Sequence, residues 1–268
     1  MLPDKTMKPK QTFNFHIHTS YSEDGYNSFR QLYKHATKND IQVLAITDHD
    51  RIDGAVDFTA WLKLNKKKGL EIIIGEEVTC SDGTHIIGLF LKNAIAAKAP
   101  LDVVKEIKDQ GALVYFPHPD RKDGILNSDS LEAVLPLGDF YECFNAKIND
   151  DFNATAVAKL SAYTHLRPLG GSDAHYNYDI RKCICTLEKH ENLFSTLQAY
   201  KLTGLIKIVG VKKWGSNNYL PGYYKIKNKL KLPLFVKIMA KSIFPLYKNY
   251  KDSKKKLVVD TILNTWKN

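Results

Sequence analysis

The sequence has no long apolar run and few cysteines, and these absences exclude several classes of protein. None of its 268 residues belongs to an apolar stretch of 18 or more, so we expect no transmembrane helix. The start, MLPDKTMKPKQ, lacks the apolar core of a secretory signal peptide. The four cysteines show no zinc-knuckle or redox spacing, which favours reduced thiols that fill space in the core of a cytoplasmic protein.

The chain also lacks internal repeats and low-complexity segments. Hydrophobic residues make up 44% and charged residues 25%, close to the average of a soluble globular domain. This composition excludes a wholly disordered chain, a collagen and a multi-span membrane protein. The length fits one or two domains, or one barrel of roughly 250 residues.

Net positive charge is absent from most of the chain, although the whole carries +10. Residues 1–200 have a net charge of −4, whereas residues 201–268 have 16 lysines, no arginine and two aspartates, a net of +14. The overall basicity is therefore no argument that the whole protein binds nucleic acid.

The basic C-terminal extension, residues 201–268, contains the segment LPLFVKIMAKSIFPLY at positions 232–247. This segment predicts a helix with one apolar face, between lysine-rich flanks. We expect the extension to pack on the rest of the protein. Peripheral contact of residues 225–256 with an anionic membrane is an alternative. Nucleic-acid binding is the third alternative. It ranks last because the aromatic residues here match no RNA-binding motif.

The pattern before the extension is that of short, fully apolar strands separated by helices, which favours a parallel α/β sheet or barrel. The expected strands are 13–17, 43–46, 71–79, 85–91, 112–116, 140–144, 169–172 and 183–187. The expected helices are 28–38, 53–68, 100–111, 154–163 and 193–202.

Metal-binding residue types follow or open these strands. His16 and His18 share one side of a strand because residues i and i+2 point the same way. The other candidates at strand ends or in the loops after them are Asp24, His49, one of the pair Glu76 and Glu77, His85, His118, Asp173 and His175. Each motif alone is weak, but in a parallel barrel all these ends meet on one face. Together they predict a polynuclear site for Mn, Fe or Zn, because mixed imidazole and carboxylate ligands disfavour an all-oxygen Ca or Mg cage.

The segments that carry these residues resemble the PHP (polymerase and histidinol phosphatase) domain family. They are HIHTSYSEDGYNSFRQL, AITDHDRIDGA, IIGEEVT, HIIGLFL, FPHPDR, ECFNA and GSDAHY, in the family's order over roughly residues 12–190. The resemblance implies a distorted TIM-like (β/α)7 barrel with up to three divalent metals, usually in a phosphoesterase. We expect this barrel at residues 12–200.

The resemblance also implies a ligand set. One metal would take His16, His18, Glu77 and Asp173; a second would share Glu77 and add His85 and His118; a third would take Asp24, His49 and His175. The family's Gly-x-Glu pattern selects Glu77 over Glu76 as the bridging carboxylate. Because all nine positions hold a competent ligand, we expect a catalytic protein with Asp173, His175 and Glu77 in its catalytic set.

Two arginines are candidates for binding a substrate phosphate. Arg121 follows the FPHP motif, and Arg181 follows GSDAHY; ordinary surface arginines are the alternative for both. We expect Asp48 to orient a histidine ligand. Glu142 and Asn145 are interpreted as structural.

The predicted function is hydrolysis of a phosphomonoester by a metal-activated hydroxide at a trinuclear site. Candidate substrates are nucleotides, sugar phosphates, histidinol phosphate or phosphotyrosine. A 5′-3′ exonuclease on short single strands is the enzymatic alternative, and a non-catalytic metal-stabilised binding module is the other. Only 33 positions separate His118 from His85, so a bisphosphate or oligonucleotide is the less favoured substrate.

Overall fold

The computed structural model of the chain describes residues 8–148, 150–212 and 257–260. Its strands are β1 (Lys10–Ile17), β2 (Val43–Ile46), β3 (Glu71–Thr79), β4 (His85–Leu89), β5 (Leu113–Phe116), β6 (Phe140–Asn145), β7 (Arg167–Gly171), β8 (Cys183–Glu188), β9 (Lys207–Lys212) and β10 (Leu257–Asp260). Its helices are α1 (Phe29–Lys38), α2 (Asp53–Leu64), α3 (Pro100–Asp109), α4 (Leu131–Val134), α5 (Asp150–Leu160) and α6 (Leu193–Thr203). Short 3-10 turns include η3 (Asp179–Lys182).

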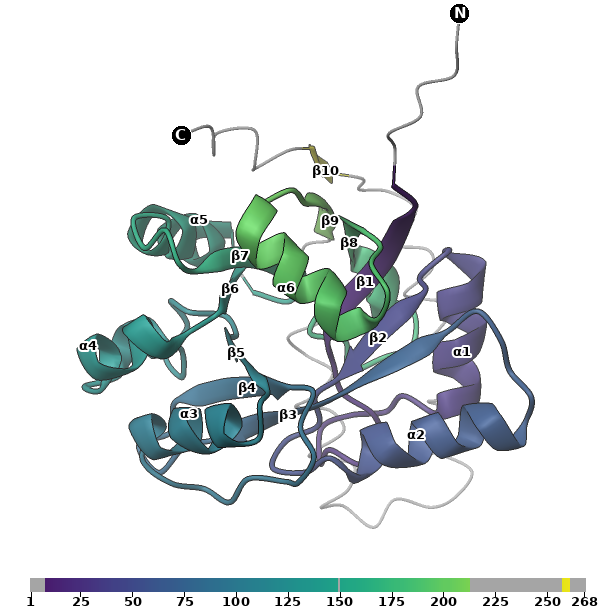
Figure 1. Cartoon of the computed structure of the whole chain (residues 1–268), viewed down its shortest axis with the longest axis horizontal. Helices are drawn as coiled ribbons and strands as arrows, with labels where there is room; N and C mark the ends of the chain where they lie inside the picture. Colours follow the sequence, from purple (N-terminus) through teal and green to yellow (C-terminus); the bar gives the residue numbers. More distant parts are fainter. Residues whose placement is uncertain (1–7, 149, 213–256, 261–268) are drawn as a thin grey trace, which may run out of the picture.

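In the described part of the chain the strands form one sheet in the order β10-β9-β8-β1-β2-β3-β4-β5-β6-β7. The sheet curves into a nearly closed barrel with helices around its outside (Figure 1). Every residue of β2 and β5 is buried, which explains why these strands read as continuous apolar runs. The expected distorted TIM-like α/β barrel is therefore confirmed.

The sheet is mixed, so the parallel arrangement that the strand pattern favours holds for only some of its strand pairs. The pairs β1–β2, β2–β3, β5–β6 and β6–β7 are parallel. The pairs β3–β4, β4–β5, β1–β8 and β8–β9 are antiparallel. A parallel return needs a crossover of about a dozen residues, and the turn at 80–84 is too short for one. As a result, the first residue of β4 lies beside the last residue of β3, at the edge where β1 and β2 also end.

The barrel closes between the ends of β1 and β7. The His18 amide donates to the Ala174 carbonyl at 3.0 Å, and the Ala174 amide donates to the His16 carbonyl at 3.3 Å. A β carbon on Gly171 would lie 1.9 Å from Glu142 Oε1 and 2.7 Å from His16 Cβ. Only glycine therefore allows β7 to approach β1 this closely.

The sheet continues past residue 200. Strand β9 pairs antiparallel with β8, and a β carbon on its Gly210 would lie 2.4 Å from the Phe144 ring. The boundary at residue 200 stays a prediction. The expected helix at 232–247 and the proposed membrane-contact segment lie outside the described residues. Of the helices that the structure describes, none is long and apolar enough to span a bilayer.

Candidate metal centre

All nine expected ligand residues gather at one edge of the barrel. They lie on strands that end or begin there, or in the loops that follow them. The set is His16, His18, Asp24, His49, Glu77, His85, His118, Asp173 and His175. Their donor atoms form overlapping groups of three or four, and within each group all donor atoms lie within 4.8 Å of one another.

Glu77 stands at the middle of the cluster and is almost fully buried. Its Oε2 lies 3.1 Å from the Nε2 atoms of both His16 and His18. Its Oε1 lies 2.9 Å from His85 Nδ1 and 2.9 Å from His118 Nε2. One carboxylate thus presents an oxygen to each of two histidine pairs, which is the geometry that a bridging ligand needs.

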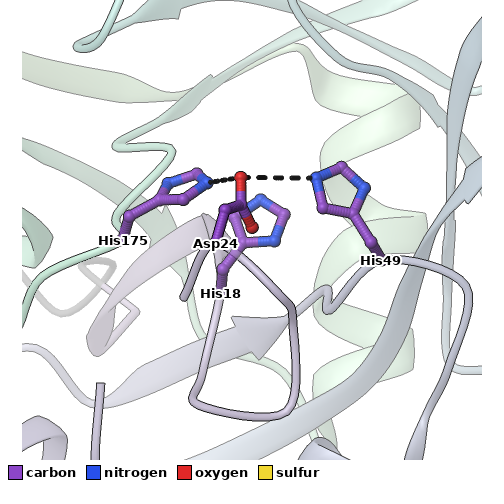
Figure 2. A group of neighbouring side chains, drawn as sticks. All are labelled: His18, Asp24, His49 and His175. Carbon is purple, nitrogen blue, oxygen red and sulfur yellow. Dashed lines mark hydrogen bonds and ion pairs between the residues drawn. The ribbon is translucent and has the colours of Figure 1, made fainter. Parts of the chain in front are cut away.

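A second group surrounds Asp24 at the outer side of the cluster. Figure 2 shows Asp24 between His175 and His49, with His18 behind it. Asp24 Oδ2 lies 2.7 Å from His175 Nε2 and 4.0 Å from His49 Nε2. These side chains come from the β1–α1 loop, the loop after β7, the loop after β2 and the end of β1.

Asp173 joins the two groups. Its Oδ1 lies 3.6 Å from His18 Nε2 and 3.3 Å from His175 Nδ1. The backbone of Asp173 has φ 48°, and that of His118 has φ 29°. Both are left-handed conformations that cost non-glycine residues free energy, so the surrounding structure must hold these two ligand candidates in place.

Asp123 is a candidate that the sequence did not reveal. Its Oδ1 lies 3.5 Å from His118 Nδ1, and it forms a possible three-residue metal group with His118 and His85. The Arg121 guanidinium donates two hydrogen bonds to the same carboxylate, from Nε to Oδ1 at 2.5 Å and from Nη2 to Oδ2 at 2.6 Å. In the sequence, Asp123 belongs to no strand end and to no motif that would mark it as a metal ligand.

Lys147 was also missed. Its Nζ lies 3.5 Å from Asp173 Oδ1 and 3.0 Å from both ring nitrogens of His175. The lysine follows the strand-end motif ECFN by two positions, a place where the sequence offered no chemical reason to select a lone lysine.

The two arginines predicted to bind substrate lie in different places. Arg121 Nη1 is 3.8 Å from Asp173 Oδ2, so this side chain borders the cluster. Arg181 is exposed on η3, and burial together with the charge of Arg181 lowers the pKa of His35 on α1. The structure thus places Arg121 at the cluster and Arg181 toward α1.

Glu142 supports the cluster from inside the barrel. Its Oε1 contacts His16 Nδ1 at 3.2 Å and accepts from the Tyr115 hydroxyl at 3.0 Å. Its Oε2 accepts from the His118 amide at 2.7 Å and from Asn145 Nδ2 at 2.8 Å. This fully buried carboxylate contacts the ring of His16 and the backbone of His118, which agrees with the structural role expected for it.

Asp48 performs a similar task beside β1. It accepts from the Thr19 amide at 2.6 Å, the Thr19 hydroxyl at 2.7 Å and the Ser22 hydroxyl at 2.9 Å. The Ser22 hydroxyl in turn lies 3.3 Å from His18 Nδ1 and accepts from the His49 amide. Asp48 therefore positions the imidazole of His18 and the backbone of His49 through Ser22.

Burial and the charges of neighbouring side chains shift the pKa values of residues in the cluster. Burial, followed by the charge of the nearby His175, lowers the pKa of His18 to about 3. Burial acts in the same direction on His16, but the charges of Glu77 and Asp173 outweigh it and hold the pKa of His16 well above its usual value. Burial raises the pKa of Glu77, yet the surrounding histidines bring it well below its usual value.

Divalent cations fit this donor set. Three buried polar atoms, Asp24 Oδ1, His49 Nδ1 and His118 Nδ1, have no hydrogen-bond partner among the described residues. Six imidazoles and three carboxylates converge on one space, and such mixed nitrogen and oxygen donors are suited to Mn, Fe or Zn. The clusters are thus consistent with a site for several metal ions.

Comparisons with known sequences identify relatives of this chain. The model of the PHP domain matches residues 14–235. An uncharacterized protein of Methanocaldococcus jannaschii is 39% identical over 117 residues, which cover 40% of this chain and 66% of that protein. A phosphoribosyl 1,2-cyclic phosphate 1,2-diphosphodiesterase of Eggerthella lenta is 31% identical over 93 residues, which cover 33% of this chain and 34% of that enzyme. These matches span less than two thirds of each relative.

Solved structures share the fold. A two-domain protein from Bacteroides vulgatus, containing a predicted PHP-like metal-dependent phosphoesterase, aligns with a TM-score of 0.59 and 16% identity, covering 78% of this chain and 73% of that chain. Endonuclease Q in complex with duplex DNA bearing an abasic lesion aligns with a TM-score of 0.56 and 14% identity, covering 72% of this chain and 57% of that chain. At such identities the likeness concerns the fold alone.

Proposed function

Since the chain belongs to the PHP domain family, we propose that it is a metal-dependent phosphoesterase that hydrolyses a phosphomonoester. The observation that carries this proposal is the placement of Glu77, whose two oxygens each face a pair of histidines within about 3 Å. Such a centre suits hydrolysis of a phosphate ester, because this reaction needs mainly positioning and neutralisation of charge.

We assign three divalent cations, Mn, Fe or Zn, to the cluster. The three ligand sets are His16, His18, Glu77 and Asp173; Glu77, His85 and His118; and Asp24, His49 and His175. When bound, such ions acidify water and neutralise charge on a phosphoryl group. Glu77 belongs to two of these sets, and Asp173 of the first set lies beside His175 of the third. His175, at the outer side, is the candidate proton donor to the leaving oxygen.

Arg121 is the proposed phosphate-binding arginine. Its side chain is 28% exposed, borders Asp173 and is held in place by Asp123, so its remaining N–H groups are oriented. A fixed guanidinium fork matches the geometry of phosphate oxygens. Arg181 would contact only a substrate that extends toward α1.

A nucleic-acid substrate is the second candidate. The segment between His85 and His118 contains β4, α3 and β5, and no inserted subdomain stands between these two residues. The short segment weighs against an oligonucleotide substrate, whereas the fold shared with an endonuclease supports one. A 5′-3′ exonuclease would release mononucleotides from short single strands.

The test is phosphate release from a panel of phosphomonoesters by Mn-loaded protein, with the Asp173→Ala variant as the blank. Turnover that is lost in the variant supports the monoesterase, and the ranking of the panel begins to define the substrate. Absence of turnover from protein with confirmed metal content contradicts it; single-stranded oligonucleotides are then tested. Inactivity on both classes would leave a metal-stabilised binding module.

A further inference from the structure

We propose that Lys147 is a substrate-binding residue whose ammonium group, which lies beside Asp173 and His175, binds the substrate's phosphoryl oxygens when cations occupy the site. This inference rests on the proposed phosphoesterase function and names a second phosphate-binding group beside Arg121. The starting observation is the position of Lys147 Nζ, 3.5 Å from Asp173 Oδ1 and 3.0 Å from the ring nitrogens of His175.

The site itself fixes the position of Lys147. The Lys147 amide donates to Asn145 Oδ1 at 2.8 Å. Asn145 Nδ2 donates to Glu142 Oε2 at 2.8 Å and to Asp173 Oδ2 at 3.3 Å. The residue is therefore tied to the carboxylates of the cluster, and only the end of its side chain is left to move. That side chain is 21% exposed, so the ammonium group is within reach of a molecule entering from solvent.

The positively charged side chains of Arg121 and Lys147 both lie near the carboxylate of Asp173, but they differ in their other contacts. Arg121 lies near Oδ2 and also has the charge of Asp123. Among the described residues, the contacts of Lys147 Nζ are Asp173 and His175. Lys147 Nζ and Asp173 Oδ1 form an ion pair at 3.5 Å, and the Asp173 side chain is almost fully buried. Lys147 thus neutralises Asp173 at the place where the proposed site puts a metal.

Metal binding would change the partners of Lys147. In the proposed ligand sets Asp173 and His175 hold different cations, which would use the donor atoms that face the ammonium group. Like charges about 4 Å apart repel each other strongly at low dielectric. Arg121 would keep its pairing with Asp123, whereas Lys147 would need a new anion. A phosphoryl group held at the cations supplies that anion on the exposed side.

The experiment uses the full chain and compares Lys147→Met with Lys147→Arg. With no substrate present, chelator competition should show that Lys147→Met binds Mn roughly tenfold more tightly, because a competing positive charge is gone. Inorganic phosphate should bind the Mn-loaded variant roughly tenfold more weakly in calorimetry, and KM should rise more than kcat falls. Lys147→Arg should restore most of the phosphate affinity.

The matched control is Lys122→Met, which removes the same charge from an exposed position next to Arg121. It should change neither Mn affinity nor phosphate affinity by more than twofold. If Lys147→Met leaves both affinities unchanged, or behaves as Lys122→Met does, the inference is overturned while the phosphoesterase can still stand. If the native protein turns over no phosphoester, the proposed function fails, and the Mn and phosphate measurements still decide the role of Lys147.

Discussion

The carboxylate of Glu142 touches no expected cation, yet its four contacts set the orientation of His16 and the backbone of His118. Three of its neighbours are donors, and His16 Nδ1 also donates when His16 Nε2 is the metal-binding atom, so the site requires an acceptor-only group. Glu142→Gln replaces one acceptor oxygen by a donor. We expect Mn affinity to fall roughly 10- to 100-fold, as for other groups that orient metal ligands. Calorimetry against the exposed Glu132→Gln variant measures this, and equal affinities would contradict it.

A second prediction at this scale concerns pH. The pKa of His16 is raised because the charges of Glu77 and Asp173 outweigh burial. Below its pKa the imidazole keeps its proton and cannot donate a lone pair, so protons compete with metal. Apparent Mn affinity should therefore fall as the pH is lowered from 8 to 6. Chelator competition across this range tests it; affinity that is constant with pH would show that His16 is no ligand.

Sequence reasoning at the residue scale succeeded where a strand fixes direction. His16 and His18 face one side because the strand alternates, and their companions follow predicted strands. Asp123 and Lys147 lie in loops whose path depends on tertiary contacts, such as the hydrogen bonds from the His85 amide to the Asp123 carbonyl and from the Ala146 amide to the Gly171 carbonyl. No periodicity describes such contacts, so these two residues became visible only in the structure.

Strand β3 shows how one element gives two neighbouring glutamates opposite environments. Glu77 faces the histidines, whereas Glu76 points away, and its Oε2 accepts from the Ile95 amide at 2.9 Å. Burial raises the pKa of Glu76 to about 7. Because the folded state binds this proton more tightly than the unfolded state, the contribution of Glu76 to stability is lost as the pH rises from about 4.5 to about 7.

Glu76→Gln should remove that loss. At pH 8 the variant should gain melting temperature relative to the native protein, compared with the same difference at pH 5. The gain should be roughly 2–4 °C for each kcal/mol that the buried charge of Glu76 costs the native protein. Thermal melts at the two pH values measure the difference. A difference that does not change with pH would mean that Glu76 titrates normally in the folded protein.

Most element bounds could be predicted because apolar runs and caps mark them. The predicted strands 43–46 and 71–79 agree with β2 and β3, and α3 begins at Pro100 as expected. Strand β9, with the sequence KIVGVK, was not predicted. Gly210 interrupts its pattern, and its role is to leave room for the Phe144 ring across the core. That contact is long-range and has no local signal.

At the scale of the whole molecule, β9 determines how far the chain can be truncated before the barrel loses stability. We expect a chain ending at residue 200 to melt several degrees below one ending at residue 212, since the shorter chain loses the partner of β8 and uncovers Phe144. Circular dichroism melts of the two truncated chains make the comparison. Equal stability would support the predicted domain boundary at residue 200.

The basic extension carries a separate prediction. Deleting residues 213–268 should reduce binding to anionic vesicles if residues 225–256 contact membranes, and binding to nucleic acid if they contact that polymer instead. Sedimentation with vesicles and gel shifts with oligonucleotides distinguish the two. If the deletion leaves both kinds of binding unchanged, neither partner is bound through the extension.

The backbone hydrogen bonds that close the barrel also separate two sides of the proposed metal centre. His16 and His18 lie on one side of this closure, and Asp173 and His175 lie on the other, next to Ala174. Ligands that bind only the closed form lower the population of locally opened states. Cations held across the closure should therefore slow amide hydrogen exchange of His18 and Ala174 far more than that of β5. The metal content of the protein would then determine how often the barrel opens.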